Sequence, residues 1–496
     1  MVNKVQDIHN EENNQMESTK QSGIRLKPLS FVLVILLTIL VTAFITNLFL
    51  NKELTNNEPN TIVDSSTTAE ERDEFEKLYN AFDKLNLDYY KEVDPTVLID
   101  GAIDGMLDSL EDPYTDYLTK QEATNFNDSI SSSFEGIGAE ISSVDGNITV
   151  VSPIKGAPAE AAGIRANDVI LTVDGTNITG MSTTEAVTLI RGEKGSEVVL
   201  TVRRPGVEEV LTIPIIRDTI PVETVYGEMV TDEIAKIQVT SFSKNTTKEL
   251  KEMMTNLEKE GMKSLILDLR QNPGGLLDQA LEMASLFMDN DKTVLFVENR
   301  DGTKYNYVSS GDKKDIELVV LIDEGSASAS EIVAGALSQN ANVPLVGKTT
   351  FGKGTVQQAF EFEDGSSVKL TTQRWLTPNG DWINEVGIKP DYEVSLPEYA
   401  FLTVISTNET YKVDDFNSQV KVAQAMLNAL GYTVREDGYF DDAMQQQVKN
   451  FQKDNNLTVD GILTGSTSAK LMDEIRTLIK ENDTQLHKAI EVLENN

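Results

Sequence analysis

The sequence predicts a multidomain α/β protein with a single N-terminal transmembrane helix, a β-rich module and a small all-α module near its C-terminus. Three observations support this fold class. The 496 residues exceed what one hydrophobic core usually organises. A single long apolar run lies near the N-terminus. Strand-like and helix-like segments alternate through the middle of the chain, which is the pattern of an α/β domain.

The composition excludes several classes of function. The chain carries 80 acidic and 43 basic side chains, a formal net charge of −37, so nucleic acid is not expected as a partner. It contains no cysteine, which removes disulfides and thiolate sites. The two histidines, His9 and His487, lie outside the expected folded core. A Ser-His-Asp triad and a His-ligated zinc site are therefore disfavoured, and no metal or cofactor is expected.

The N-terminal region predicts a membrane anchor. Residues 1–28 are polar and form the expected cytoplasmic tail, with basic residues directly before the apolar segment 29–50. That segment is long enough for a transmembrane helix, and longer than the apolar part of a typical cleaved signal peptide, which is the alternative. We therefore expect a single-pass protein of the cell membrane whose catalytic domain lies outside the cytoplasm. Residues 51–68 are predicted to be a linker.

The remaining chain divides by periodicity and turn signals. A helical region is expected first, and then short β-rich runs with one helix, TTEAVTLIRG. An α/β segment follows, and the chain ends in amphipathic helices separated by Asp-Gly turns. The expected boundaries are a helical N-terminal region at 69–133, a β-rich domain at 134–218, an α/β core at 219–400, a small all-α domain at 412–475 and a C-terminal helix at 476–496.

The segment VVLIDEGSASASEIVAGAL is the best place for a nucleophile. It predicts a strand, a turn of small residues and a helix whose N-terminus would stabilise an oxyanion. Ser326, Ser328 and Ser330 are all candidates. On turn chemistry alone, the three serines are more simply turn and helix-capping residues.

A serine nucleophile without a usable histidine needs another base, and a buried lysine is the recognised substitute. Lys353, in TTFGKGTVQQAF, is flanked by glycines and lies near apolar residues. Burial would lower its pKa toward the working pH. An exposed loop lysine is the ordinary alternative.

The motifs GSASASE, GKGTVQQ and DLRQNPGG together resemble those of the C-terminal processing peptidases, also called tail-specific proteases. The resemblance implies a Ser/Lys dyad, with Ser328 as nucleophile and Lys353 as general base. A family glutamine that orients the lysine falls on Gln357. The oxyanion hole would be formed by backbone N–H groups of Ala329 and of Gly274 or Gly275.

Upstream, FEGIGAEI and the glycine-rich segment after it resemble a PDZ domain, which binds a peptide C-terminus as an added strand. The resemblance implies contacts from Gly136, Ile137 and Gly138, with Ile137 also lining the pocket for an apolar terminal side chain. The alternative is a PDZ fold that only packs against the core. Arg191 is a further candidate contact or interdomain link, although a surface ion pair is the simpler reading.

The C-terminal helices, from about residue 420 to 471, are similar to peptidoglycan-binding domains of cell-wall enzymes. The combined resemblance implies a membrane-anchored serine endopeptidase that cleaves exported proteins or peptides near their C-termini. Peptidoglycan is an expected partner. Residues 70–130 are expected to belong with the peptidase core and are candidates for homodimer contacts. One alternative is a catalytically silent PDZ scaffold that tethers peptides to the cell wall. A second alternative is a cell-wall acyl-transfer enzyme. Such enzymes carry an S-x-x-K pattern, in which Ser and Lys are three positions apart, whereas Ser328 and Lys353 lie much farther apart, so this alternative is disfavoured.

Overall fold

The computed structural model describes residues 73–144 and 146–495. The chain divides into two compact units, residues 1–95 and 96–496. In the first unit the described elements are the 3-10 helix η1 (Asp73–Phe75) and helix α2 (Glu76–Asp88). Both lie in the segment where apolar spacing predicts a helix.

The predicted fold class needs one correction, which concerns the transmembrane helix. Among the described residues no helix is both long and apolar enough to cross a membrane. The longest of them, α12 (Gly465–Glu481), has 17 residues and carries charged side chains, whereas a span needs about 20 apolar residues. Segment 29–50 lies outside the described residues, as do the predicted tail 1–28 and linker 51–68. The structure therefore does not support this element of the fold class.

Two helices and a short strand open the second unit. Helix α3 (Pro95–Asp108) leads through a turn at residues 112–115 into strand β1 (Asp116–Leu118), and helix α4 (Lys120–Ile130) follows. A capping box fixes the start of α4, because Thr119 and Glu122 satisfy each other's backbone N–H groups. The turn at 112–115 is thereby placed between two regular elements.

A β-rich module follows, with strands in the spatial order β3-β4-β5-β7-β8. The one helix predicted here is α6 (Thr183–Ile190), and the structure adds a short helix, α5 (Pro158–Ala161). Strand β3 forms one edge of this sheet, because it pairs with β4 only. Strand β2 (Ser133–Gly136) pairs with β9 (Asp218–Pro221) in a separate two-stranded sheet. The other strands are β3 (Ala139–Val144), β4 (Asn147–Pro153), β5 (Val169–Val173), β6 (Thr176–Asn177), β7 (Glu197–Arg203) and β8 (Leu211–Ile216).

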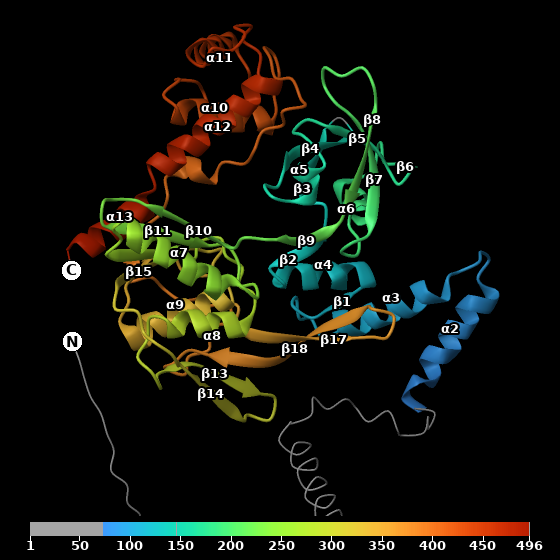
Figure 1. Cartoon of the computed structure of the whole chain (residues 1–496), viewed down its shortest axis with the longest axis vertical. Coiled ribbons are helices and arrows are strands. Elements are labelled where there is room, and N and C mark those ends of the chain that lie inside the picture. Colours follow the sequence, from blue (N-terminus) through green and yellow to red (C-terminus); the bar gives the residue numbers. More distant parts are fainter. Residues whose placement is uncertain (1–72, 145, 496) are drawn as a thin grey trace, which may run out of the picture. The chain divides into compact units, whose positions relative to one another are not determined.

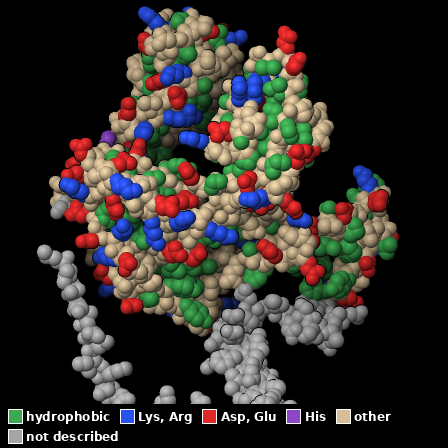
Figure 2. All heavy atoms as spheres, in the orientation of Figure 1, with side chains coloured by type: hydrophobic (Ala, Val, Ile, Leu, Met, Phe, Trp, Pro, Cys, Tyr) green, Lys and Arg blue, Asp and Glu red, His purple; other side chains and the backbone are tan. Residues whose placement is uncertain are grey.

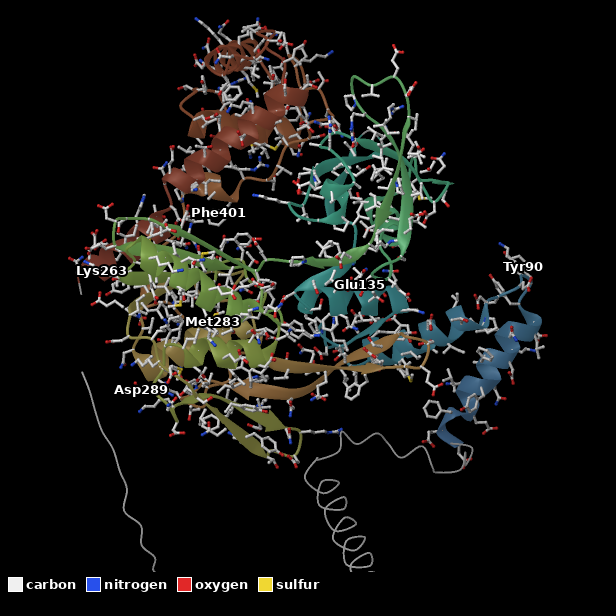
Figure 3. All side chains as sticks on the ribbon, in the orientation of Figure 1. Tyr90, Glu135, Lys263, Met283, Asp289 and Phe401 are labelled. Atoms are coloured by element: carbon white, nitrogen blue, oxygen red, sulfur yellow. The ribbon has the colours of Figure 1, made fainter. Side chains whose placement is uncertain are left out.

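The α/β part is built on a six-stranded sheet in the order β10-β11-β12-β15-β16-β19, antiparallel only between β10 and β11. Helices α7 (Thr246–Glu260), α8 (Leu277–Ser285) and α9 (Ala329–Ala341) share one large apolar core with its strands. Met283, labelled on α8 in Figure 3, is fully buried in that core. The strands are β10 (Val225–Met229), β11 (Ile234–Val239), β12 (Ser264–Asp268), β15 (Glu317–Ile322), β16 (Leu345–Gly347) and β19 (Tyr392–Glu393).

A second sheet brings together segments that lie far apart in the sequence. Its order is β1-β18-β13-β14, and β17 also pairs with β18. Strand β1 pairs antiparallel with β18, so residues 116–118 lie beside residues 367–369. This pairing places the 112–115 turn next to the strands that follow Lys353. The strands are β13 (Thr293–Asn299), β14 (Lys304–Val308), β17 (Thr355–Glu361) and β18 (Ser367–Leu376).

The C-terminal helices form a small module with its own apolar core. After the 3-10 helix η2 (Glu398–Phe401), the module contains α10 (Ser418–Ala429), α11 (Asp442–Asp454) and α12, which continues beyond residue 475 to Glu481. The last helix, α13 (Thr484–Glu494), packs against strands of the α/β sheet, as Figure 1 shows. Sequence reasoning gave this helix no role, whereas the structure makes it a cover for the sheet face opposite α7, α8 and α9.

The acidic composition is spread over the surface. On the face drawn in Figure 2, acidic and basic side chains are interspersed over the α/β part. The described residues also form exposed ion pairs, such as Lys313 with Asp289. Exposed pairs of this kind contribute little to stability.

Candidate active site

The three candidate serines lie at the junction of β15 and α9, and their side chains have different surroundings. Ser326 and Ser330 are fully buried, and their hydroxyls donate to backbone carbonyls of Leu269 (2.8 Å) and Asn272 (2.9 Å). Both therefore hold the turn against the strand-to-helix connection after β12. Ser328, in contrast, lines a cavity of about 890 Å³. Of the three, only Ser328 opens into that cavity.

Ser328 has an unusual backbone conformation. Its φ of 54° and ψ of −112° place it where residues other than glycine are strained. It immediately precedes helix α9, whose first residue is Ala329. A sharp, strained strand-to-helix turn is the usual way to present a nucleophilic serine above a sheet.

Two glycines after β12 lie in close contact with other segments, Gly274 with Ser328 and Gly275 with Phe242. A Cβ atom at Gly274 would lie 2.8 Å from the Ser328 Cβ, and one at Gly275 would lie 2.2 Å from the Phe242 carbonyl oxygen. Their φ values of 103° and 145° lie in the range that favours glycine. Only glycine fits at these two positions.

The two glycines differ in whether their N–H groups are free. The Gly274 N–H donates to the Asn272 side chain at 2.9 Å. No hydrogen bond joins the N–H of Gly275 or of Ala329 to another residue of the described chain. Of the donors suggested for an oxyanion hole, Ala329 and Gly275 are therefore available in this structure, and Gly274 is engaged.

Lys353 lines the same cavity as Ser328. Its ammonium lies 4.8 Å from the centre of the Tyr114 ring. Burial lowers the pKa of Lys353 below its ordinary value, and the charge of Lys369 acts in the same direction. Asp112 and Glu331 oppose this change. Among the described residues no hydrogen bond joins Lys353 Nζ to Ser328 Oγ, and catalytic hydrogen bonds commonly tighten only when substrate binds.

Glu331 ties the turn that carries Ser328 to the loop that carries Lys353. Its carboxylate is fully buried. One oxygen accepts from the Ser328 N–H and the Lys353 N–H, both at 2.8 Å. The other accepts from the Thr350 hydroxyl (2.6 Å) and the Gly352 N–H (2.7 Å). Sequence reasoning missed this residue, although Ser328 and Glu331 form the S-x-x-E pattern of a capping box.

Gln357 lies on β17 and also lines the cavity. Its amide nitrogen donates to the hydroxyls of Thr355 (2.9 Å) and Thr371 (3.0 Å). None of its described hydrogen bonds reaches Lys353. The structure thus brings Gln357 into the site and anchors it to β18, and its predicted action on the lysine stays a prediction.

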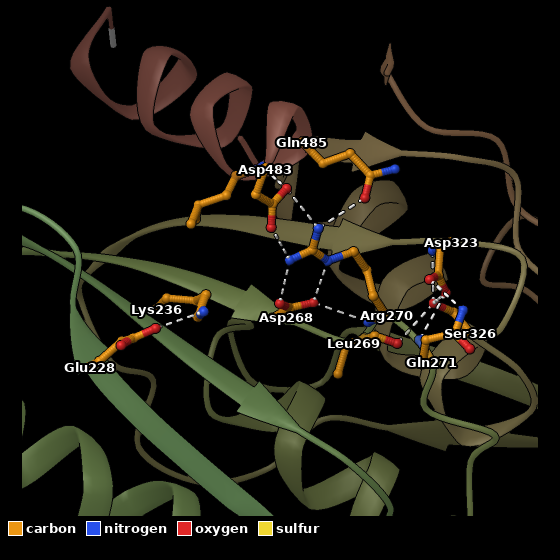
Figure 4. Close-up of polar contacts among 11 residues, drawn as sticks. Glu228, Lys236, Asp268, Leu269, Arg270, Gln271, Asp323, Ser326, Asp483 and Gln485 are labelled. Atoms are coloured by element: carbon orange, nitrogen blue, oxygen red, sulfur yellow. Dashed lines mark hydrogen bonds and ion pairs between the residues drawn. The ribbon is translucent and has the colours of Figure 1, made fainter. Parts of the chain in front are cut away.

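Arg270 lies in the connection that leads to the two glycines, and Figure 4 shows its polar contacts. Its guanidinium donates to Asp268, to Asp483 and to Gln485 at distances between 2.7 and 3.0 Å. Burial disfavours its charge, but the hydrogen bonds and charges of the two carboxylates raise its pKa above the ordinary value. Asp483 caps α13, so the last helix of the chain is bonded to the segment that leads to Gly274.

The residues predicted to bind a peptide end lie at the edge of the β-rich module. Ile137 and Gly138 line a small pocket of about 90 Å³, together with side chains of α6, whereas Gly136 ends β2 outside that lining. Strand β3, directly after Gly138, is the free sheet edge that an added strand needs. Arg191 forms an ion pair with Asp128 of α4 and stacks over Phe134, which makes it an intramolecular link between modules.

Comparison with known families matches four parts of the chain. Residues 233–394 match the model of peptidase family S41, and residues 149–204 match a PDZ domain. Residues 417–471 match a putative peptidoglycan binding domain. Residues 36–122 match the activating protease CtpB N-terminal domain, so this match begins inside the segment predicted to span the membrane.

Similar proteins match over most of their length. The carboxy-terminal processing protease CtpA of Bacillus subtilis is 49% identical over 430 residues, which cover 86% of this chain and 92% of the relative. A probable CtpA-like serine protease of Staphylococcus aureus is 39% identical over 97% of this chain and 96% of the relative. A solved photosystem II D1 C-terminal processing protease is 31% identical over 64% of this chain and 88% of that chain, with a TM-score of 0.39. The chain therefore belongs to the carboxy-terminal processing proteases of peptidase family S41, with a PDZ domain and a peptidoglycan-binding-like domain.

Proposed function

We propose that this serine peptidase cleaves exported proteins near their C-termini through a dyad in which Ser328 is the nucleophile and Lys353 the general base. The observation that carries the proposal is the shared cavity of about 890 Å³, which both side chains line. The lowered pKa of Lys353 supports the role of base, since a base must be available in its neutral form. The free N–H groups of Gly275 and Ala329 support an oxyanion hole beside Ser328.

The chemistry follows the usual acyl-enzyme route. Ser328 Oγ attacks the scissile carbonyl carbon while its proton passes to Lys353 Nζ. The ammonium then gives this proton to the leaving nitrogen as the C–N bond breaks. Water attacks the acyl-enzyme in the same manner and releases Ser328. Gln357 is proposed to orient the lysine.

The test of the dyad is covalent labelling with a fluorophosphonate, with the adduct located by mass spectrometry. We expect the adduct on Ser328 in the parent chain, and loss of peptide hydrolysis in Lys353→Ala. Lys348→Ala is a matched control, because Lys348 pairs with Glu393 and lies outside the cavity lining. Hydrolysis near the parental rate in Lys353→Ala would refute the dyad. Failure of Ser328 to label would favour a silent binding protein.

Recognition of a substrate C-terminus by the PDZ domain is the second part of the proposal. The free edge of β3 and the small pocket beside Ile137 support it. Cleavage of a peptide with a free C-terminus should be faster than cleavage of the same peptide with an amidated end. Ile137→Asp should remove this difference, and Ile216→Asp, on the exposed face of β8, should keep it. Equal rates for both peptides in the parent chain would argue against recognition of the terminus.

We also propose that the peptidase works outside the cytoplasm, in contact with peptidoglycan. The match of residues 417–471 to a peptidoglycan binding domain supports this location. The purified chain should sediment with isolated cell-wall sacculi and remain in solution with cellulose. A homodimer is a further part of the proposal, supported by exposed apolar side chains on α2 such as Leu87, and sedimentation equilibrium measures it directly.

A further inference from the structure

The turn at residues 112–115 reaches the active site from a part of the chain that lies far upstream of the peptidase core. Pro113 and Tyr114 line the same cavity as Ser328 and Lys353. The structure gives this turn a place beside the catalytic lysine.

The turn is held firmly in this place. The Asp112 carboxylate accepts from the Tyr114 N–H (3.1 Å) and from the Thr115 hydroxyl (2.7 Å). The Thr115 hydroxyl oxygen accepts in turn from the Thr371 N–H of β18 at 3.1 Å. Because β1 pairs with β18 directly after the turn, backbone pairing and side-chain hydrogen bonds fix the same geometry.

One contact and one electrostatic influence connect the turn to Lys353. The ammonium lies 4.8 Å from the centre of the Tyr114 ring, within the range of a cation–π contact. The Asp112 carboxylate acts on Lys353 through its charge. The other charged groups that face the ammonium are Lys369 on β18 and Glu331 on α9.

We propose that Tyr114 and Asp112 are positioning residues of the catalytic lysine: the Tyr114 ring holds the Lys353 amine in the cavity and shields it from water, and the Asp112 carboxylate stabilises the ammonium that forms when Ser328 gives up its proton. This inference rests on the proposed role of Lys353 as general base. It assigns part of the catalytic apparatus to the segment before the PDZ domain.

The two residues act on the lysine in opposite directions. Burial is the largest influence on the pKa of Lys353 and lowers it. The Tyr114 ring shields the amine but also attracts the ammonium as a cation–π partner. We expect the loss of shielding to be the larger of these two effects, so removing the ring should raise this pKa. Asp112 raises the pKa of Lys353, so removing its charge should lower it. The phenol of Tyr114 does not compete in the neutral range, since burial and nearby carboxylates raise its own pKa above the ordinary value.

The pH dependence of fluorophosphonate labelling at Ser328 tests the inference, because labelling reports activation of the serine by its base. In Tyr114→Ala the acid limb should move to higher pH, with at least about a threefold loss at neutral pH that is recovered at alkaline pH. Tyr114→Phe retains the ring and should return the limb to its parental position. In Asp112→Asn the limb should move the other way, to lower pH.

The controls separate positioning from folding. Tyr117→Ala removes a tyrosine of β1 that hydrogen-bonds Asp100 instead of lining the cavity, and Asp108→Asn neutralises an exposed carboxylate at the end of α3. Slower labelling with an unmoved acid limb in both Tyr114→Ala and Asp112→Asn would overturn the inference. If Tyr114→Ala does not fold, Asp112→Asn still decides, because only the proposed role predicts a downward shift. Persistent hydrolysis in Lys353→Ala would instead refute the dyad itself.

Discussion

Replacing Glu331 by glutamine should separate the two halves of the active site. The Glu331 carboxylate accepts hydrogen bonds both from the turn that carries Ser328, at the Ser328 N–H, and from the loop that carries Lys353, at the N–H groups of Gly352 and Lys353. Glutamine has nearly the same shape, but one of its two terminal atoms is an NH₂ group that can only donate. If the NH₂ group is turned toward the N–H groups of Ser328 and Lys353, both lose their acceptor and face another donor. If it is turned the other way, the Gly352 N–H does so, whereas the Thr350 hydroxyl can rotate to accept from the amide.

The size of the effect follows from the number of bonds lost. A hydrogen bond to a charged group contributes about 1.5–3 kcal/mol, so losing one or two of them should cost about 1.5–6 kcal/mol. Burial already raises the pKa of Glu331, and the four hydrogen bonds oppose that rise. A domain is typically stable by about 5–15 kcal/mol, so the peptidase core of Glu331→Gln should still fold, but with a much smaller margin.

The assay combines urea unfolding with hydrogen–deuterium exchange and Ser328 labelling. Exchange should accelerate selectively in peptides that contain residues 326–331 and 350–353, and labelling should slow strongly. Glu324→Gln is the matched control, since it makes the same chemical change at an exposed position of the same turn. An unfolding free energy within about 1 kcal/mol of the parent, together with parental exchange in both segments, would refute the reasoning.

Two further predictions concern the segment from Arg270 to Gly275 and its contact with α13. Asp483→Asn should weaken the contact of α13 with Arg270 and lower the free energy of unfolding by about 1.5–3 kcal/mol, measured by urea denaturation. Arg270 lowers the pKa of Asp483 against the effect of burial, so this stabilisation should be present above about pH 3.9 and lost as the pH falls through the lower folded value. Gly275→Ala should abolish hydrolysis and Ser328 labelling, because its Cβ would lie 2.2 Å from the Phe242 carbonyl. Gly105→Ala, where the added Cβ meets no neighbour, should leave both unchanged.

Sequence patterns were sufficient where a function depends on local chain geometry. The β-strand, small-residue turn and helix around Ser328 could be predicted, because strand runs and helix periodicity are local properties. The choice among the three serines could not be made from turn chemistry. It depends on where Ser326 and Ser330 find acceptors, and these are the carbonyls of Leu269 and Asn272 in another segment.

Long-range contacts account for what the sequence left open. The turn before β1 becomes part of the cavity only because β1 pairs with β18, and no local signal encodes that pairing. The sequence could not show which of Gly274 and Gly275 has a free N–H group, since that depends on the hydrogen bond from the Gly274 N–H to the side chain of Asn272. Glu331 differs from these cases, because a local signal for it exists in the sequence: the capping-box pattern that it forms with Ser328.

The position of α13 changes how the peptidoglycan-binding-like module must be understood. In the sequence this module looks like an appendage that ends before the last helix. In the structure the chain enters the module from β19, which pairs with β16. It leaves the module into α13, which packs on the same sheet. Asp483, the N-cap residue of α13, accepts a hydrogen bond from Arg270. Both ends of the module are therefore anchored on the peptidase core. Cutting the chain after residue 475 would remove the sheet cover and the Arg270 partner along with the helix, so loss of activity in such a truncation would not by itself show that peptidoglycan binding is needed for catalysis.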